Sequence, residues 1–236
     1  MKLYVGTSGY AYKEWVGPFY PEDVSKNDWL SYYAGRLSGV EINNSFYRVP
    51  RTEVVEKWAA SVPADFRFVL KVTRRVTHFS RLKETADEPM QWMCKAAEAL
   101  GERRGPLLFQ LPPNLRADVD RLRDFLGRLP AGMRPAFEFR HASWLSPEVA
   151  EVLGAAGATL CLAETDDEPA PELTTSADFG YLRLRKQGYE DDEIAAWVDR
   201  ARAMDWREVY VFFKHEDAGV GPALAARFRE RFEAAG

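Results

Sequence analysis

Charged and amide side chains interrupt the apolar segments of this 236-residue chain, and each stands late in its segment. Two are carboxylates, Glu41 and Glu138, which could act as a general base or as an acid and base pair. The others could bind an anion: Asn43, Lys71, Gln110, Arg140, Arg183, Arg185 and Lys214. Because cations outnumber carboxylates in this set, we expect a phosphate, a carboxylate or a nucleic-acid backbone as the ligand.

Aromatic side chains stand near these polar groups in the sequence. The stacking candidates and their cationic or imidazole neighbours are Tyr10, Trp15, Tyr47, Arg48, His78, His141 and Trp144. Aromatic rings interleaved with cations suit a base or a sugar whose phosphate is held nearby. The alternative interpretation is that most of these rings form a small core that packs a long loop.

Eight short apolar runs must position these groups. The runs are dense in Val, Leu, Phe and Tyr and lack clean alternation, as is typical of parallel strands that are covered on both faces. We predict strands at Lys2–Gly6, Gly39–Asn43, Phe66–Val72, Pro106–Leu111, Pro135–Arg140, Ala158–Ala163, Tyr181–Arg185 and Val209–His215. The period of two along a strand places Glu138 with Arg140, and Arg183 with Arg185, on one face.

Helical patterns fill most of the gaps between these runs. We predict helices at Thr52–Val62, Pro89–Glu102, Asp118–Leu129, from Pro147 after a Ser146 cap, Asp192–Met204 and Pro222–Ala235. Strands that alternate with helices predict one TIM-like (β/α)₈ barrel domain over residues 1–236, with its site at the strand C-terminal ends. The helix after the sixth strand should be short or missing, because Glu164–Asp178 is rich in proline. An open doubly wound sheet is the alternative.

The composition narrows the class of protein. A formal net charge of −4 gives no overall attraction to nucleic acid or to an anionic membrane, although a local basic cleft is compatible with it. Cys94 and Cys161 lack any metal-ligand spacing and suit two reduced thiols. No segment reads as a signal peptide or a membrane span, so we expect a cytoplasmic protein without membrane contact.

Several blocks of the sequence resemble the YecE-like family, domain of unknown function 72. The blocks are GTSGYAYKEWVGPFYP (Gly6–Pro21), VEINNSFYRVP (Val40–Pro50), FVLKVTRRVTH (Phe68–His78), GPLLFQLPP (Gly105–Pro113), EFRHASW (Glu138–Trp144), YLRLR and VYVFFKHE. The resemblance implies a (β/α) barrel but no mechanism. Barrels of this family are similar to those of endonuclease IV-like proteins, and a nucleic-acid role follows from that similarity of fold alone.

The chain departs from the family pattern on the predicted rim. Arg183-Leu184-Arg185-Lys186 stands where the resemblance implies arginine, leucine, histidine and glycine, and Lys214-His215-Glu216-Asp217 replaces an asparagine-rich turn. Both changes would alter the ligand that the rim selects.

Other kinds of chemistry have weaker signals. The three histidines form neither HxH nor HExxH, so we expect no multi-zinc centre and no cofactor, while a single divalent ion on Glu41 and Glu138 stays open. There is no GxSxG motif, and the GTSG turn is neither a P-loop nor GxGxxG. Glycoside cleavage by Glu41 and Glu138 is an alternative, although flanking cations should keep both ionised.

The first functional hypothesis is an enzyme or enzyme-like barrel, including a hydrolase, that acts on a phosphorylated or nucleic-acid-derived ligand. Cations would hold the anion, Glu41 or Glu138 would be the base, and Tyr10, Tyr47 and Trp144 would stack. A non-catalytic nucleic-acid-binding module is the second hypothesis, and a glycoside-cleaving enzyme is the third. The sequence does not specify an oligomeric state.

Overall fold

Eight parallel strands close into a barrel in the computed structural model, which describes residues 1–172 and 177–235. The strands follow one another in chain order, and β1 pairs with β8 to complete the barrel. Their bounds are β1 Lys2–Ser8, β2 Gly39–Ile42, β3 Arg67–Lys71, β4 Arg104–Gln110, β5 Pro135–Glu138, β6 Thr159–Glu164, β7 Phe179–Leu184 and β8 Glu208–Phe213. The predicted TIM-like (β/α)₈ barrel is confirmed, and the open sheet is excluded.

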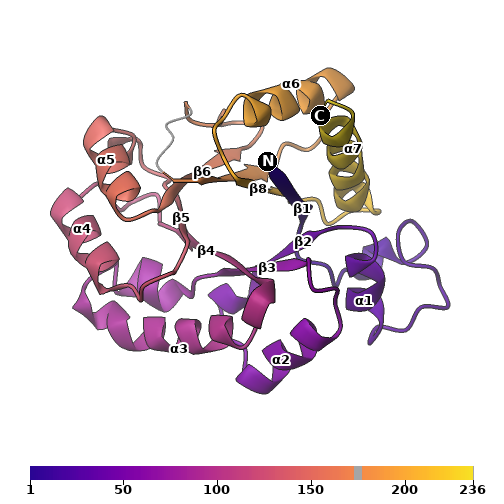
Figure 1. The fold of residues 1–236 in the computed structure, drawn as a ribbon, viewed down its shortest axis with the longest axis horizontal. Coiled ribbons are helices and arrows are strands. Elements are labelled where there is room, and N and C mark those ends of the chain that lie inside the picture. The colour runs from indigo at the N-terminus through magenta and orange to yellow at the C-terminus, as the bar shows by residue number, and fades with distance from the viewer. Residues whose placement is uncertain (173–176, 236) are drawn as a thin grey trace.

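The α-helices form an outer layer around the strands (Figure 1). They are α1 Trp29–Ala34, α2 Thr52–Ala60, α3 Asp87–Glu98, α4 Val119–Arg128, α5 Pro147–Ala155, α6 Asp191–Arg202 and α7 Val220–Ala234. The predicted start of α5 is confirmed, because the Ser146 side chain accepts a hydrogen bond from the Val149 N–H and Pro147 occupies the first turn. α3 begins before its predicted start at Pro89, because proline is tolerated in the first turn of a helix.

The segment between β6 and β7 is irregular. Its described residues, 165–172 and 177–178, form no helix. Pro169 and Pro171 lack the N–H groups that a helix interior needs. The prediction that the helix after the sixth strand is short or missing is therefore confirmed for the described residues. Residues 173–176 lie outside the part of the chain that the structure describes.

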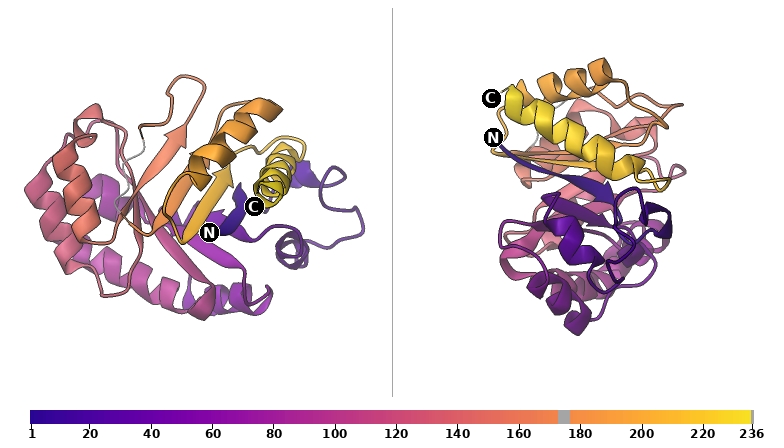
Figure 2. Two further views of the ribbon diagram at one scale, coloured as in Figure 1. Left: turned by 45° about the horizontal axis from the view of Figure 1, so that its top comes forward. Right: turned by 90° about the vertical axis from the view of Figure 1, so that its right-hand side faces the viewer.

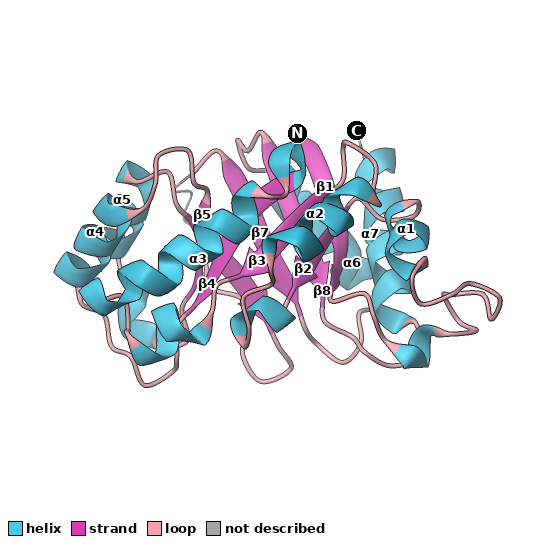
Figure 3. Ribbon diagram, turned by 90° about the horizontal axis from the view of Figure 1, so that it is seen from below, coloured by secondary structure: helices cyan, strands magenta, loops and turns pink. Residues whose placement is uncertain are grey.

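The barrel interior is filled by every second side chain of each strand. Its middle is apolar and includes Val69, Leu108, Cys161, Tyr181 and Phe212, among other buried residues. On most strands the next inward position toward the strand C-terminal end is polar. Figure 3 shows this end of the barrel at its lower edge, because β1 begins beside the N label at the top and all strands run parallel.

The long connection after β1 packs on the side of the barrel and projects beside α1 (Figure 2). Trp15 and Tyr20 are fully buried, and the Tyr20 ring stacks on Trp29 with centroids 4.8 Å apart. These rings form the small loop-packing core that was the alternative interpretation of the aromatic residues.

Neither cysteine forms a disulfide. Cys94 on α3 is half-buried, and Cys161 lies inside the barrel. Among the described helices, none has both the length and the apolar character that a membrane span requires.

Candidate functional site

A layer of polar side chains closes the barrel interior at the strand C-terminal ends. We call it the polar layer, and it consists of Ser8, Glu41, Lys71, Gln110, Glu138 and Arg183. Strand register holds neighbours at the same height, since Ser8 pairs with Glu41 and Gln110 pairs with Glu138. The structure therefore brings together five residues that the sequence analysis selected from five separate strands.

Arg183 stands at the centre of the polar layer and joins its two carboxylates. Its Nη2 donates to Glu41 Oε1 at 2.7 Å, and its Nη1 donates to Glu138 Oε2. Ser8 Oγ donates to Glu41 Oε1 at 2.7 Å, and Tyr181 Oη donates to Glu41 Oε2 at 2.6 Å. Glu41 is fully buried, so all of its hydrogen-bonding capacity is directed at the protein.

Glu138 accepts hydrogen bonds from several side chains on the outer side of the polar layer. Its Oε1 accepts from Gln110 Nε2 at 2.7 Å, from Arg140 Nε at 3.1 Å and from Arg185 Nη2 at 3.4 Å. Lys71 Nζ donates to Gln110 Oε1 at 2.8 Å, so the amide of Gln110 links the lysine to this carboxylate. Arg140 and Arg185 lie one inward position above the polar layer, as the period of two predicted.

Both carboxyl groups are held in the ionised form. Burial alone raises the pKa of Glu41 and of Glu138, but Arg183, together with the other donors and cations around each group, outweighs it and holds both pKa values below their ordinary range. Arg185 and Arg140 lower the pKa of Glu138 further. A glycosidase acid must carry a proton near neutral pH, and neither group does. The geometry therefore gives no support to glycoside cleavage by this pair.

Positive charge exceeds negative charge at the mouth of the barrel. The four cations Lys71, Arg140, Arg183 and Arg185 face the carboxylates of Glu41 and Glu138, and Glu168 adds a third carboxylate at the adjoining cavity. Burial, followed by the repulsion of Arg183, lowers the pKa of Lys71 to about 8. Burial also lowers the pKa of Arg185, and its buried Nε has no hydrogen-bond partner among the described residues. An anion bound beside Arg185 would neutralise part of the positive charge and accept a hydrogen bond from the free Nε–H.

A cavity of about 200 Å³ opens beside this excess charge. Arg140, His141 and Arg185 line it together with Phe139 and Pro169, and two carboxylates, Glu138 and Glu168, also form part of its wall. It is smaller than a drug-sized pocket and fits a phosphate group or a short ligand. We call it the mouth cavity.

His78 lies among the cations on the β3 side of the mouth. Burial, together with nearby Lys71 and Arg140, lowers its pKa, so the imidazole is neutral at neutral pH. It belongs to a single π-helical turn, Arg75–Phe79, and Arg81 and Leu82 follow with positive φ angles of 51° and 63°. Such turns and strained residues are frequent at functional sites.

Two exposed aromatic rings flank a cation beside this turn. Tyr47 is 67% exposed and Phe79 is 68% exposed, and the Arg74 guanidinium lies 5.6 Å and 5.4 Å from their ring centroids. Tyr47 was a predicted stacking residue, whereas Phe79 and Arg74 were missed. Their signal was present in the FVLKVTRRVTH block and the phenylalanine that follows it.

Two predicted stacking residues are instead part of the protein core. Trp144 is 1% exposed, stacks on Phe139 and donates from Nε1 to the Leu115 carbonyl at 2.7 Å. Trp15 is fully buried and donates from Nε1 to the Glu216 carbonyl at 3.0 Å. A ring that is packed on both faces offers no surface to a ligand, so neither residue contributes a stacking face here.

The remaining predicted residues lie around the rim. Tyr10 and Asn43 are half-buried and Arg48 is exposed. The His141 side chain accepts a hydrogen bond from the Ser143 N–H and thereby caps a short turn. Lys214 is exposed and lines a different cavity, of about 730 Å³, which it shares with Arg185 and with acidic residues of the last loop.

The sequence analysis missed two partners of Glu41, Ser8 and Tyr181. Tyr181 stands two positions before Arg183 and therefore on the same face of β7, which is the signal that could have found it. In the part of the chain that the structure describes, no three or more His, Cys, Asp or Glu side chains gather as a metal site would require.

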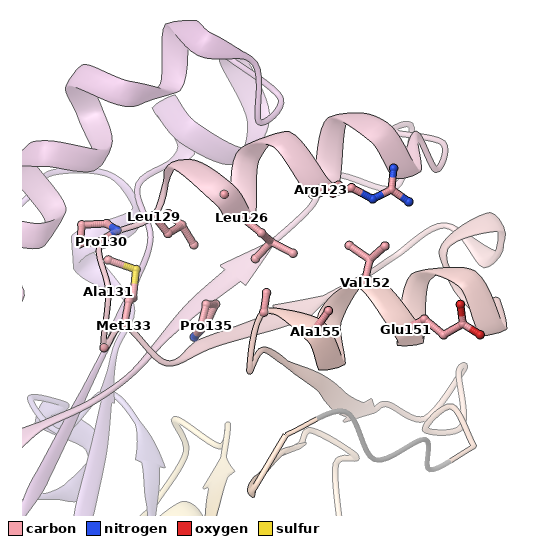
Figure 4. A pocket seen from close by; sticks show the side chains of 13 residues that line it. Arg123, Leu126, Leu129, Pro130, Ala131, Met133, Pro135, Glu151, Val152 and Ala155 are labelled. Carbon is pink, nitrogen blue, oxygen red and sulfur yellow. The ribbon is translucent and has the colours of Figure 1, made fainter.

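An apolar cavity that is larger than the mouth cavity lies away from the mouth. It measures about 560 Å³ and lies between α4, α5 and the loop that joins α4 to β5 (Figure 4). Leu126, Met133 and Val152 line it, with Arg123 and Glu151 at one end. It contains none of the predicted site residues.

The fold and the site together define a (β/α)₈ barrel whose mouth is polar and carries excess positive charge. The family model described as "Protein of unknown function DUF72" matches residues 4–236, and the chain belongs to this family.

The chain is similar to curated members of the family. The UPF0759 protein YunF of Bacillus subtilis is 24% identical over 231 residues, which cover 90% of this chain and 78% of YunF. The UPF0759 protein YecE of Escherichia coli K12 is 26% identical over 145 residues, which cover 61% of this chain and half of YecE.

Solved structures agree with the barrel. A DUF72 family protein from Thermotoga maritima has a TM-score of 0.85 at 26% identity, covering 99% of this chain and all of that one. A DUF72 family protein from Enterococcus faecalis has a TM-score of 0.80 at 18% identity, covering 98% of this chain and 95% of that one. SacUVDE, with a TM-score of 0.59 at 8% identity and 99% of both chains covered, shares the fold.

Proposed function

We propose that the barrel mouth binds a ligand through a phosphate or a similar oxyanion held between Arg140 and Arg185. The observation that carries this proposal is the Arg185 side chain, which lines the mouth cavity and whose buried Nε has no partner among the described residues. A buried donor without an acceptor costs about 1–3 kcal/mol, and an oxyanion removes this cost. The guanidinium fork matches the geometry of phosphate oxygens.

The carboxylates have a supporting role in this proposal. Glu138 accepts from both Arg140 and Arg185, and Glu41 fixes the other end of Arg183. They hold the guanidinium groups in place. We therefore assign Glu41 and Glu138 as positioning residues of the anion site.

Thermal unfolding tests this function. Inorganic phosphate at 100 times its Kd stabilises a one-site protein by about 2.7 kcal/mol, which corresponds to a rise in Tm of roughly 5–10 °C for a chain of this size. We expect this rise for the wild type, measured against chloride at equal ionic strength, and its loss in Arg185→Met and in Arg140→Met.

Arg123→Met is the control, because Arg123 lies on α4 and lines the apolar cavity. It should keep the full rise in Tm. A phosphate effect that persists in both mouth variants would show that the anion binds elsewhere, and no effect on the wild type would contradict the proposal.

A second candidate function is the binding of single-stranded nucleic acid. The exposed rings of Tyr47 and Phe79 on either side of Arg74 favour it, since bases stack on aromatic side chains at about 1–3 kcal/mol each. Phosphates of the same strand would reach the cations of the mouth.

Fluorescence anisotropy with labelled single-stranded oligonucleotides tests this candidate. We expect binding at ~50 mM salt that weakens steeply as salt rises, with at least a several-fold loss of affinity in Tyr47→Ala and Phe79→Ala. Val54→Ala removes an exposed apolar residue from α2 and should leave the affinity unchanged. Absence of binding at ~50 mM salt would end this candidate.

A further inference from the structure

Lys71 differs from the other cations of the mouth in its partners. It forms no ion pair with any residue that the structure describes, because the arginines occupy both carboxylates. Its Nζ donates to Gln110 Oε1 at 2.8 Å and lies 4.4 Å from the centroid of the Phe46 ring. A half-buried lysine without a carboxylate partner is incompletely compensated in its ammonium form, although the Gln110 oxygen and the face of the Phe46 ring both attract the ammonium group.

The amine of Lys71 is consequently a better nucleophile than an exposed lysine. Burial and the nearby Arg183 lower its pKa to about 8. Roughly a tenth of such an amine is neutral at pH 7, compared with well under a thousandth for a lysine of ordinary pKa. Lowering the pKa by desolvation and a neighbouring cation is a recognised way to activate a lysine for attack on a carbonyl carbon.

The amine and the anion site belong to one hydrogen-bonded chain. Lys71 donates to Gln110, Gln110 donates to Glu138, and Glu138 accepts from Arg140. Lys71 is half-buried at the last position of β3, where the barrel opens. Lys71 is not among the residues that line the mouth cavity, so a ligand whose anionic group lies between the arginines would extend across Glu138 and Gln110 to reach the Lys71 Nζ.

We propose that Lys71 forms an imine with an aldehyde or ketone that carries a phosphate or carboxylate group. The anionic group is held by Arg140 and Arg185, so this inference rests on the proposed anion site. The Nζ lone pair forms a bond to the carbonyl carbon, and the π electrons move to oxygen. A proton passes from nitrogen to that oxygen to give a carbinolamine, and loss of one water molecule forms the C=N bond.

Reductive trapping tests this inference on the full chain. The protein is incubated at pH 7 with pyruvate or glycolaldehyde phosphate in the presence of sodium cyanoborohydride, and adducts are located by peptide mass spectrometry. We expect one dominant adduct, of the probe mass less one oxygen atom, at Lys71 and at least ten-fold below that level at exposed Lys57. Neutral acetaldehyde should show no such preference.

The matched variants separate this inference from the proposed function. Lys71→Arg keeps the positive charge but cannot form an imine, so it should lose the dominant adduct. Lys57→Arg should keep the dominant adduct at Lys71 and the rise in Tm with inorganic phosphate. Labelling of Lys71 in the wild type that does not exceed labelling of Lys57 overturns the inference. If phosphate still raises Tm in that case the anion site stands, and if it does not, both proposals fall.

Discussion

Arg183 is the residue on which the mouth of the barrel depends. It is 2% exposed and contacts both Glu41 and Glu138, which are at most 1% exposed. Removing one member of a buried ion pair leaves charge in a medium of low polarity, which costs about 3–5 kcal/mol. The polar layer is therefore a structural unit as well as the floor of the proposed site.

We expect Arg183→Met to lower the free energy of unfolding at pH 7 by about 3–5 kcal/mol, as measured by urea denaturation. Arg123→Met is the control, because Arg123 pairs with Asp120 on the surface and its loss should change stability by less than about 0.5 kcal/mol. Equal effects of the two substitutions would show that Arg183 does not stabilise the carboxylates.

The effect of pH on stability has a defined sign. The pKa values of Glu41 and Glu138 are lowered in the folded state, chiefly by Arg183 acting against burial. Their stabilisation is therefore fully present above the unfolded value of about 4.3 and is lost as pH falls toward the folded values. We expect the stability difference between wild type and Arg183→Met to narrow below about pH 4. A difference that is constant from pH 7 to pH 3 would contradict this assignment.

Part of the site could be predicted residue by residue from the sequence. Polar residues late in apolar runs located Glu41, Lys71, Gln110, Glu138 and Arg183, because a buried strand tolerates such groups only where they are paired or hydrated. The roles of the two tryptophans were not predictable. Whether an aromatic ring packs a loop or faces a ligand is decided by tertiary contacts, as with Trp144 on Phe139.

At the scale of elements, the strands position the site through their alternation and register. The outward face of β7 is tightly packed at Gly180, since a Cβ there would lie 2.3 Å from a ring carbon of Trp206. The inward Arg183 is therefore held by a strand that cannot shift freely. The ends of the elements were predicted less well than their presence, because caps and final turns depend on neighbouring chain segments.

We expect Gly180→Ala to destabilise the protein by about 1–3 kcal/mol, because the added methyl group must displace the Trp206 ring. Gly188→Ala is the matched control, since nothing lies within 4 Å of the added atom, and it should change stability by less than about 0.5 kcal/mol. Thermal or urea unfolding of the two variants measures the difference. Equal stability of the two variants would contradict the tight packing of β7.

For the molecule as a whole, the closed barrel was predictable because its signal is repeated. Eight apolar runs that alternate with helical patterns together predict a barrel, even though the described residues contain no helix between β6 and β7. The charge distribution was harder to predict from the sequence. A chain with a net charge of −4 places a positively charged group of side chains at one end of its barrel, and only the fold brings those residues together.

The central claim is that this positively charged mouth holds an oxyanion, and a crystal structure of the protein grown with inorganic phosphate tests it most directly. The account predicts tetrahedral density in the mouth cavity, with oxygen atoms within hydrogen-bond distance of Arg185 Nε and of the Arg140 guanidinium. The same density should be absent from crystals of Arg185→Met grown in the same solution. A mouth cavity that holds only water in the wild type at saturating phosphate would contradict the account.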